Sequence, residues 1–298
     1  MAQTMQDFYL LIVNDCSTDN SLDVVEQFFV KHPRQYELIS FELNQGIGYA
    51  RHFAERYAKT KYMMFLDADD CLTPNAIDVM FRKITSDKDL MAVGCYLEYV
   101  DENGKKIGGG LYLGATTKEE FYQKAQNKKL IFMQPTAIYD RMLALSVGGY
   151  VIDGYPKGQP RFQDYCEDLD LWTRMSDLYK DGKAIVVVPE VLCKYRKGGG
   201  LSSSAFNMIL KMRYTKTNLL RRRAGERELS FVEFYKSLSA NLLNKYRREA
   251  NAADALRNGV FYLKRRNVLR GGWLIAKSLW YKPSYLFDKL KYNTGLKK

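Results

Sequence analysis

Apolar runs and helix-like spacings alternate along the first half of the chain. Residues 8–13 and 62–66 are apolar runs of the length typical of buried strands, and residues 36–41 predict a further strand between them. Between them, residues 17–19 offer N-cap side chains for a first helix, and residues 47–59 predict a second helix. Strands that alternate with helices predict an α/β class, with a mostly parallel sheet that has helices on both faces.

The middle of the chain has a less regular pattern. Residues 91–100 predict a longer strand, and residues 117–120, which read Thr-Lys-Glu-Glu, have the spacing of a capping box that opens a short helix. Residues 148–160 hold four glycines and two prolines, a composition that is typical of a loop. A helix over residues 165–178 and a strand over residues 184–188 are predicted after this loop.

The charge of the chain is divided unevenly. The whole sequence has a formal net charge of +12. Residues 1–206 hold 24 Lys and Arg against 28 Asp and Glu, a net charge of −4, whereas residues 207–298 hold 22 against 6, a net charge of +16. After three glycines at residues 198–200, the pattern is helical almost to the end. We therefore expect an α/β domain over residues 1–205 and a basic helical region over residues 206–298.

Basic clusters and aromatic residues interleave in the C-terminal region. Arg221-Arg222-Arg223 is one such cluster, and Trp273 and Trp280 lie near the end. Helices of this composition are typical of proteins that lie on anionic membrane surfaces. The alternative is a packed helical appendage with a solvated basic face. Nucleic-acid binding is less favoured, because no signature of a nucleic-acid-binding fold accompanies the charge.

An acidic step, Asp67-Ala68-Asp69-Asp70, follows the third predicted strand. Carboxylates at the end of a strand can reach the crevice at the edge of an open α/β sheet. Hard divalent cations prefer such oxygen ligands and share them with phosphates. The spacing therefore indicates a cation site, with the alternative that these carboxylates only cap a helix that begins near Pro74.

Five segments, taken in order, resemble the motifs of one family. They are residues 14–19 after the first strand, residues 44–51, the acidic step, residues 167–172 (Glu-Asp-Leu-Asp-Leu-Trp) and residues 191–202, which include Tyr195-Arg196. Their order and spacing, from about residue 2 to residue 205, resemble a family 2 glycosyltransferase with the GT-A fold. Each motif is weak by itself, and the signal comes from their order.

The resemblance implies a metal-dependent, inverting glycosyltransferase that uses a nucleotide-diphosphate sugar, in the first instance a UDP-sugar. It places Mg²⁺ or Mn²⁺ on Asp69 and Asp67, where the cation neutralises the departing diphosphate. It assigns Asp168, with Glu167 beside it, as the base that accepts the proton of the acceptor hydroxyl. The alternative for this pair is a set of helix N-terminal acids that favour the helix dipole.

The expected nucleotide contacts are Asp15, Arg51 and Asp67. A carboxylate at Asp15 can accept the imide N–H of uracil, Asp67 can contact the ribose, and Arg51 is expected near the base or the diphosphate. The alternatives are an Asx-turn for Asp15 and an ordinary exposed helix arginine for Arg51. Gly46 and Gly48 are expected to serve the turn and the close packing of the next helix.

Two departures from the family pattern shape these expectations. The family's first strand, with its Pro-x-Tyr-Asn type motif, is not found, so we expect an N-terminally shortened version of a longer protein. Gly198 stands where many relatives have a histidine that helps to hold the metal, so we expect weaker cation binding. The loop over residues 148–161 is expected to take part in acceptor recognition.

The expected acceptor is a glycan or a lipid-linked glycan in surface polysaccharide biosynthesis. The expected location is cytoplasmic and peripheral, at the inner face of the cytoplasmic membrane. Five scattered cysteines without zinc spacing agree with a reducing compartment. Two rival functions stay open: a catalytically weak sugar-nucleotide-binding protein, and a membrane or nucleic-acid adaptor that uses the basic C-terminal helices.

Overall fold

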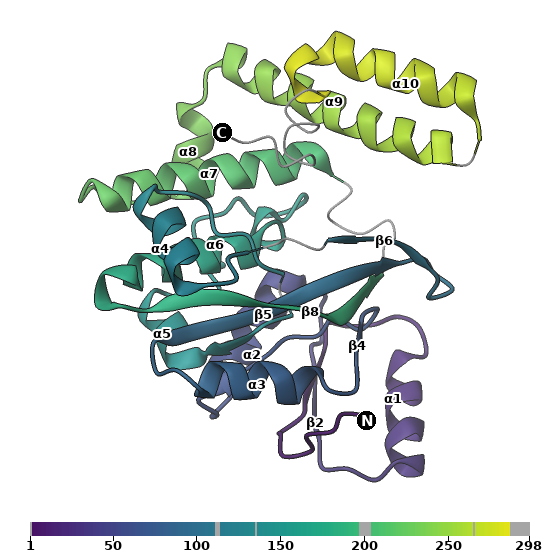
Figure 1. The fold of residues 1–298 in the computed structure, drawn as a ribbon, viewed down its shortest axis with the longest axis vertical. Helices are drawn as coiled ribbons and strands as arrows, with labels where there is room; N and C mark the ends of the chain where they lie inside the picture. Colours follow the sequence, from purple (N-terminus) through teal and green to yellow (C-terminus); the bar gives the residue numbers. More distant parts are fainter. Residues whose placement is uncertain (1, 111–113, 135, 197–203, 265, 287–298) are drawn as a thin grey trace. The chain divides into compact units, whose positions relative to one another are not determined.

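The structure is a computed structural model that describes residues 2–110, 114–134, 136–196, 204–264 and 266–286 (Figure 1). The chain divides into two compact units. The first is Met1–Gly200 with Thr215–Glu228, and the second is Leu201–Tyr214 with Leu229–Lys298. The predicted boundary after residue 205 lies near the first division, but the first unit also takes in residues 215–228.

The described residues of the first unit form two separate sheets. β1 (Leu11–Asn14) pairs in parallel with β2 (Glu37–Ser40), and these two strands form a small sheet of their own. Among the described residues, the second sheet has six strands in the order β3-β7-β5-β8-β4, with β6 paired to β5. Its strands are β3 (Tyr62–Met63), β4 (Cys71–Leu72), β5 (Leu90–Val100), β6 (Lys106–Gly110), β7 (Ile138–Asp140) and β8 (Ala184–Arg196).

The α/β class is confirmed, but the second sheet is mixed where a mostly parallel sheet was predicted. Its long strands β5 and β8 are parallel, whereas β6 and β7 run antiparallel to β5, and β3 and β4 are also antiparallel to their neighbours. β3, β4 and β7 have only two or three residues each, which is too short for a periodic signal. The strand predicted over residues 62–66 ends at Met63, because its pairing with β7 covers only two residues.

Helices cover the second sheet on both sides (Figure 1). The α-helices that begin in the first unit are α1 (Ser21–Lys31), α2 (Ile47–Tyr57), α3 (Ala76–Thr85), α4 (Lys118–Gln126), α5 (Arg141–Ser146) and α6 (Glu167–Met175). Short 3₁₀ segments, Phe162–Asp164 and Ser176–Asp181, precede and follow α6. The helix predicted over residues 165–178 is therefore α-helical only in its middle.

The core of the first unit lies around β5 and β8. The first residues of both strands are apolar and buried. On one side, α3 contributes Ala76, Met80 and Ile84, which are spaced by four residues and at most 1% exposed. On the other side lie α4 and α6, and the fully buried Trp172 of α6 packs edge to face on Tyr139 of β7. This core fixes α6, the helix that begins with the Glu167-Asp168 pair.

The second unit is helical, as the sequence predicted. α7 (Ala205–Arg223) begins in it, and α8 (Phe231–Ser237), α9 (Ala240–Lys264) and α10 (Val268–Tyr281) follow. α9 and α10 pack closely, because a Cβ on Gly271 would lie only 2.7 Å from the side chain of Leu263. In the described part of the chain, no helix combines the length and the apolar content that crossing a bilayer requires.

Candidate active site

One buried arginine joins two of the motifs that the sequence singled out. Arg51 lies on α2 and is only 4% exposed. Its Nη2 contacts Asp67 Oδ1 at 2.7 Å, and its Nη1 contacts Glu167 Oε1 at 2.5 Å. The acidic step and the start of α6 therefore meet at one guanidinium, although 116 positions separate Arg51 from Glu167 in the sequence. We call this contact the Arg51 bridge.

The acidic step folds as a tight turn. The Asp70 N–H donates to the Asp67 carbonyl at 3.0 Å, which reverses the chain before β4. Arg196, at the end of β8, holds this turn from outside: its backbone N–H donates to Asp70 Oδ1, and its Nε donates to the Asp69 carbonyl at 3.0 Å. Arg196, which belongs to the last of the five motif segments, therefore fixes the acidic turn.

The three carboxylates of the turn have different surroundings. Asp67 is partly buried on the Arg51 bridge, Asp69 is exposed, and Asp70 is 7% exposed. Asp70 Oδ2 is buried without a hydrogen-bond partner among the described residues. Burial, together with the nearby Asp69 and Asp67 charges and against the pull of Arg196, raises the pKa of Asp70 to about 6.

The acidic turn fits a cation that takes few ligands from the protein. In the described ranges, no three His, Cys, Asp or Glu side chains come together as a closed metal site. The orphaned oxygen of Asp70 and its raised pKa mark an excess of negative charge that a nearby cation would relieve. Asp69 and the Asp67 oxygen that does not contact Arg51 could serve as ligands, and Mg²⁺ commonly completes its shell with water and substrate phosphate. Gly198, the other residue considered for the metal, lies outside the described residues.

Asp69 also opens into a cavity of about 310 Å³. Lys194 and Arg196 of β8 line the same cavity, next to the acidic turn. A carboxylate with two cationic side chains around one space can hold a phosphate-bearing ligand, because the cations neutralise part of its charge.

Glu167 and Asp168 occupy the first turn of α6. Cys166 precedes them in the left-handed conformation with φ 50°, and acidic residues in a first turn favour the helix dipole. Burial, opposed by Arg51 and assisted by Asp168, raises the pKa of Glu167 to about 7. Burial also raises the pKa of Asp168, again against the attraction of Arg51. A carboxyl group with such a pKa is suited to exchange protons near neutral pH.

Asp15 lies at the end of β1 and holds the turn before α2. Its Oδ1 accepts from the Gln45 N–H at 2.6 Å, and its Oδ2 accepts from the Gly46 N–H at 2.8 Å and from Asn44 Nδ2 at 2.9 Å. The carboxylate therefore positions this turn with both oxygens. Cys16, the next residue, has φ 59°, a left-handed backbone conformation in which glycine is less strained.

Arg161 and Asp164, which the sequence did not single out, also hydrogen-bond to the turn before α2 and to the start of that helix. Arg161 donates to both oxygens of Asn44, and its Nε contacts Asp164 Oδ2 at 3.0 Å. Asp164 Oδ1 accepts from the Gly48 N–H at 2.9 Å. A Cβ on Gly46 would overlap the Asp164 carboxylate, so this glycine is required for close packing, as expected. No pattern marks Arg161 or Asp164, because both lie in irregular sequence.

The glycine-rich loop over residues 148–160 borders a cavity that Arg161 also lines. The cavity has a volume of about 460 Å³ and is lined mainly by residues 152–159, together with Gln45, Arg161 and Gln163. Most of the loop that was expected to recognise the acceptor therefore borders an open space next to the predicted nucleotide turn.

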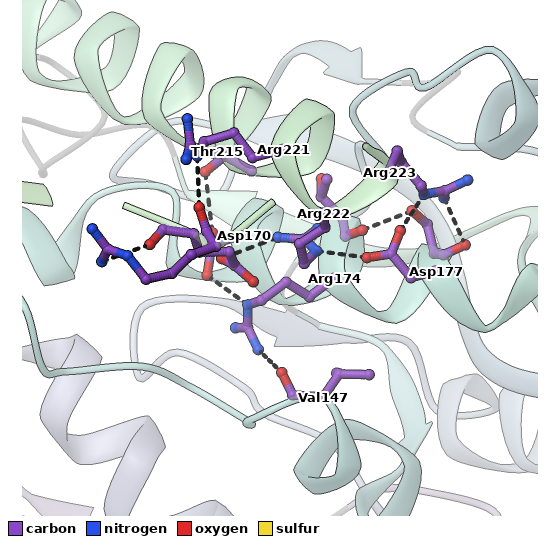
Figure 2. A network of polar contacts seen from close by, with 12 residues as sticks. Val147, Asp170, Arg174, Asp177, Thr215, Arg221, Arg222 and Arg223 are labelled. Carbon is purple, nitrogen blue, oxygen red and sulfur yellow. Dashed lines mark hydrogen bonds and ion pairs between the residues drawn. The ribbon is translucent and has the colours of Figure 1, made fainter. Parts of the chain in front are cut away.

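A network of polar contacts joins α6 to segments before and after it in the sequence (Figure 2). Asp170 contacts Arg174 Nε at 3.0 Å, and Thr215 Oγ1 donates to Asp170 Oδ1 at 3.2 Å. Arg174 also donates to the carbonyls of Val147 and Gly149 at 2.5 and 2.6 Å. The spacing of Asp170 and Arg174, four residues on a predicted helix, is a signal that sequence reasoning could have used. The network fixes the helix two positions after Asp168.

A paired contact continues this network along α7. Arg222 Nε contacts Asp177 Oδ2 at 2.6 Å, and Arg223 contacts the other oxygen of the same carboxylate. Arg221 also pairs with Glu226 at 2.9 Å, so all three residues of the basic cluster predicted for membrane contact form ion pairs within the first unit.

Comparisons with known proteins agree with the motifs. Residues 1–147 match the model of the family described as glycosyl transferase family 2. An uncharacterized glycosyltransferase of Methanocaldococcus jannaschii is 27% identical over 195 residues, which are 65% of this chain and 62% of that relative. A chondroitin synthase of Pasteurella multocida is 35% identical over 108 residues, which are 36% of this chain and 11% of that relative. The chain thus spans about three fifths of the first relative's length.

Two solved structures share the fold. The chain matches S. aureus TarS 1-349 in complex with UDP with a TM-score of 0.50 and 17% identity, over 99% of this chain and 85% of that one. It matches the mannosyltransferase PcManGT from Pyrobaculum calidifontis, in complex with GDP-Man and Mn²⁺, with a TM-score of 0.50 and 17% identity, over 97% and 81% of the two chains. These likenesses confirm the predicted GT-A fold.

Proposed function

The chain is a member of glycosyl transferase family 2 through residues 1–147, and from this membership we propose that it transfers a sugar from a nucleotide-diphosphate donor to a glycan or lipid-linked acceptor. The observation that carries the proposal is the Arg51 bridge, which brings Asp67 of the acidic step and Glu167 of the predicted base motif to one point. A donor site and a proton acceptor must lie this close if one bond is to break while another forms.

In the proposed reaction, Asp168 accepts the proton of the acceptor hydroxyl. The hydroxyl oxygen forms a bond to the anomeric carbon of the sugar, and the bond from that carbon to the diphosphate breaks, with its electron pair leaving on the diphosphate oxygen. Because no covalent enzyme intermediate is involved, the anomeric configuration inverts. Glu167 shares the negative charge of the site with Asp168 and is positioned by Arg51.

The donor diphosphate is proposed to lie beside the acidic turn. Asp69 and Asp67 would hold Mg²⁺ or Mn²⁺ there, and such a cation offsets the charge that develops on the leaving diphosphate. Lys194 and Arg196 border the same cavity and would add positive charge. The matched fold neighbours were solved with UDP in one case and with GDP-Man and Mn²⁺ in the other, which supports a nucleotide donor without deciding its base.

The nucleoside is proposed to lie near the turn that Asp15 holds. Since both Asp15 oxygens already accept N–H groups, a uracil imide would have to share them. The match to a chondroitin synthase supports an acceptor from surface polysaccharide biosynthesis. We further propose a location at the inner face of the cytoplasmic membrane, where the +16 charge of residues 207–298 would meet anionic lipid.

The test is a panel of UDP- and GDP-sugars, each with Mn²⁺ or with EDTA, assayed for release of the nucleoside diphosphate with and without glycan acceptors. Asp168→Asn should lower turnover by about 10²-fold or more and leave donor affinity nearly unchanged. Asp69→Ala should abolish the Mn²⁺-dependent part of donor binding. Glu119→Gln, an exposed carboxylate on α4, is the matched control and should behave as the parent protein.

Two outcomes would refute this assignment. Unchanged turnover in Asp168→Asn would exclude this residue as the base. Donor binding without turnover on any acceptor would favour the rival function, a catalytically weak sugar-nucleotide-binding protein. The anomeric proton coupling of the product, measured by NMR, reports inversion or retention independently of the variants.

A further inference from the structure

α10 carries large apolar side chains on the face that points away from α9. Leu269, Trp273 and Trp280 are 90%, 60% and 73% exposed. Their spacings of four and seven residues place them on one stripe of the helix. Gly271 and Ser278, on the opposite side of the helix, are buried, and Ser278 Oγ donates to the Ala252 carbonyl of α9 at 2.8 Å. We call the three exposed residues the tryptophan face.

Packing on α9 uses only part of the apolar surface of α10. A helix that packs on its neighbour commonly buries its large apolar residues and exposes its polar ones. On α10, Ile275 lies next to Gly259 of α9, whereas the residues of the tryptophan face stay exposed. Burial against α9 therefore does not account for the tryptophan face.

Cationic side chains border this face. Lys277 Nζ lies 4.9 Å from the ring centroid of Trp273 and 5.8 Å from that of Tyr281, and the Arg270 guanidinium lies 4.2 Å from the ring centroid of Tyr262. These side chains keep positive charge beside the exposed ring of Trp273 and beside two half-buried tyrosine rings. Tryptophan beside lysine and arginine is the combination that residues at a membrane interface commonly show.

We propose that the tryptophan face inserts into the headgroup region of an anionic phospholipid bilayer. The proposal deepens the membrane location given above by naming the surface and the lipid chemistry. Charge complementarity selects this partner, because residues 207–298 hold 22 cationic against 6 acidic side chains. The same excess of charge disfavours a second copy of the chain on this face, since two basic surfaces repel. Leu269 and the two indoles would have no matching surface on a phosphate backbone.

Tryptophan fluorescence tests this directly. The sequence has three tryptophans: two belong to the tryptophan face, and the other, Trp172, is fully buried in the first unit. Fluorescence emission from Trp273 and Trp280 should shift to the blue when the full chain meets vesicles. Vesicles of phosphatidylcholine alone are compared with equimolar phosphatidylcholine and phosphatidylglycerol. We expect binding and the blue shift with the anionic vesicles only, and quenching by brominated lipid.

The variant is Trp273→Ser with Trp280→Ser, and its matched control is Val24→Ser with Val30→Ser on α1, where the parent side chains are 54% and 80% exposed. Co-sedimentation with anionic vesicles should fall by about tenfold or more in the tryptophan variant, because each indole loses a buried apolar contact. The control should bind as the parent does. Circular dichroism confirms that both variants are folded.

Three results would overturn the inference. Parent-like vesicle binding by the tryptophan variant would assign binding to charge alone. A dimer seen by light scattering, lost in that variant and unaffected by vesicles, would assign the face to a second copy. A blue shift with an oligonucleotide and none with vesicles would assign it to nucleic acid. Nucleotide-sugar hydrolysis measured without vesicles should be equal in parent and variant, so failure here is separable from failure of the proposed transferase activity.

Discussion

Replacement of Arg51 tests the central bridge of the site. Arg51→Met fills most of the side-chain volume but leaves Asp67 and Glu167 without their shared cation. Breaking a buried ion pair costs about 3–5 kcal/mol. The Asp67 side chain is 28% exposed and Glu167 is 10% exposed, so solvent recovers part of that cost and we expect about 3 kcal/mol.

Urea unfolding, followed by tryptophan fluorescence, measures this loss, and the two tryptophans of the second unit can be removed by substitution. In a Trp273→Ser/Trp280→Ser background, Trp172 on α6 is the only tryptophan and reports on the first unit. With an m value of about 2 kcal/mol/M, a loss of 3 kcal/mol lowers the unfolding midpoint by about 1.5 M. Arg51→Lys keeps one charge and one contact, so its midpoint should lie between those of Arg51→Met and the parent.

The penalty should also depend on pH. Arg51 opposes the rise in the pKa of Glu167 to about 7, so its removal raises that pKa further. At pH 5 Glu167 is protonated in the parent and in the variant, so this carboxyl loses little there; at pH 8 the parent carboxylate is stabilised by Arg51 and the variant has lost that stabilisation. Arg51→Met should therefore lose more stability at pH 8 than at pH 5.

A matched control is Arg82→Ala on α3, whose side chain is 79% exposed in a surface pair with Asp78. Surface pairs of this kind contribute less than about 1 kcal/mol. If Arg51→Met unfolds at the same midpoint as this control at pH 8, or loses equal stability at both pH values, the bridge does not hold the two carboxylates as argued.

Three further predictions concern single residues. Folded protein keeps the proton of Glu167 up to a pKa of about 7, whereas the unfolded chain releases it near 4.5, so unfolding free energy should fall as pH rises between these values; Glu167→Gln should flatten this slope in urea titrations. Cys16→Gly should stabilise the protein by about 0.5–1 kcal/mol and raise its thermal midpoint, because Cys16 has φ 59°, which strains a residue with a Cβ. Cys16→Ala keeps the Cβ and should give no gain; an equal gain would show that backbone strain at this position is not the cause. Arg174→Met should lower stability by about 3 kcal/mol or more in calorimetry, and Arg174→Lys by less, because lysine keeps the charge; equal losses would show that the charge of this side chain does not contribute.

The local sequence was enough to predict several helices and strands and the motifs at their ends. Thr117 is the N-cap of α4 and accepts from the Glu120 N–H, as its pattern predicts. The long apolar run at residues 91–100 is the central strand β5. Such features depend on neighbours within a few positions, so periodicity and capping rules can detect them.

Contacts between residues far apart in the sequence could not be predicted from local patterns. The two carboxylate partners of Arg51 cannot be assigned from spacing, and an exposed helix arginine was a fair alternative until burial was known. Arg161 and Asp164 lie in irregular sequence, so no period marks them. Each is selected by three-dimensional packing against a glycine turn more than 100 positions away, which one sequence does not encode in any local pattern.

The long sequence span of these contacts bears on how the protein matures during translation. Gly48 contacts Asp164, Asn44 contacts Arg161, and Arg51 contacts Glu167. The two residues of each pair are separated by 116, 117 and 116 positions in the sequence, respectively. A nascent chain must therefore emerge beyond residue 167 before its early half can acquire these partners. A fragment that stops at residue 147, where the family match ends, would leave the Arg51 guanidinium with one of its two carboxylates missing.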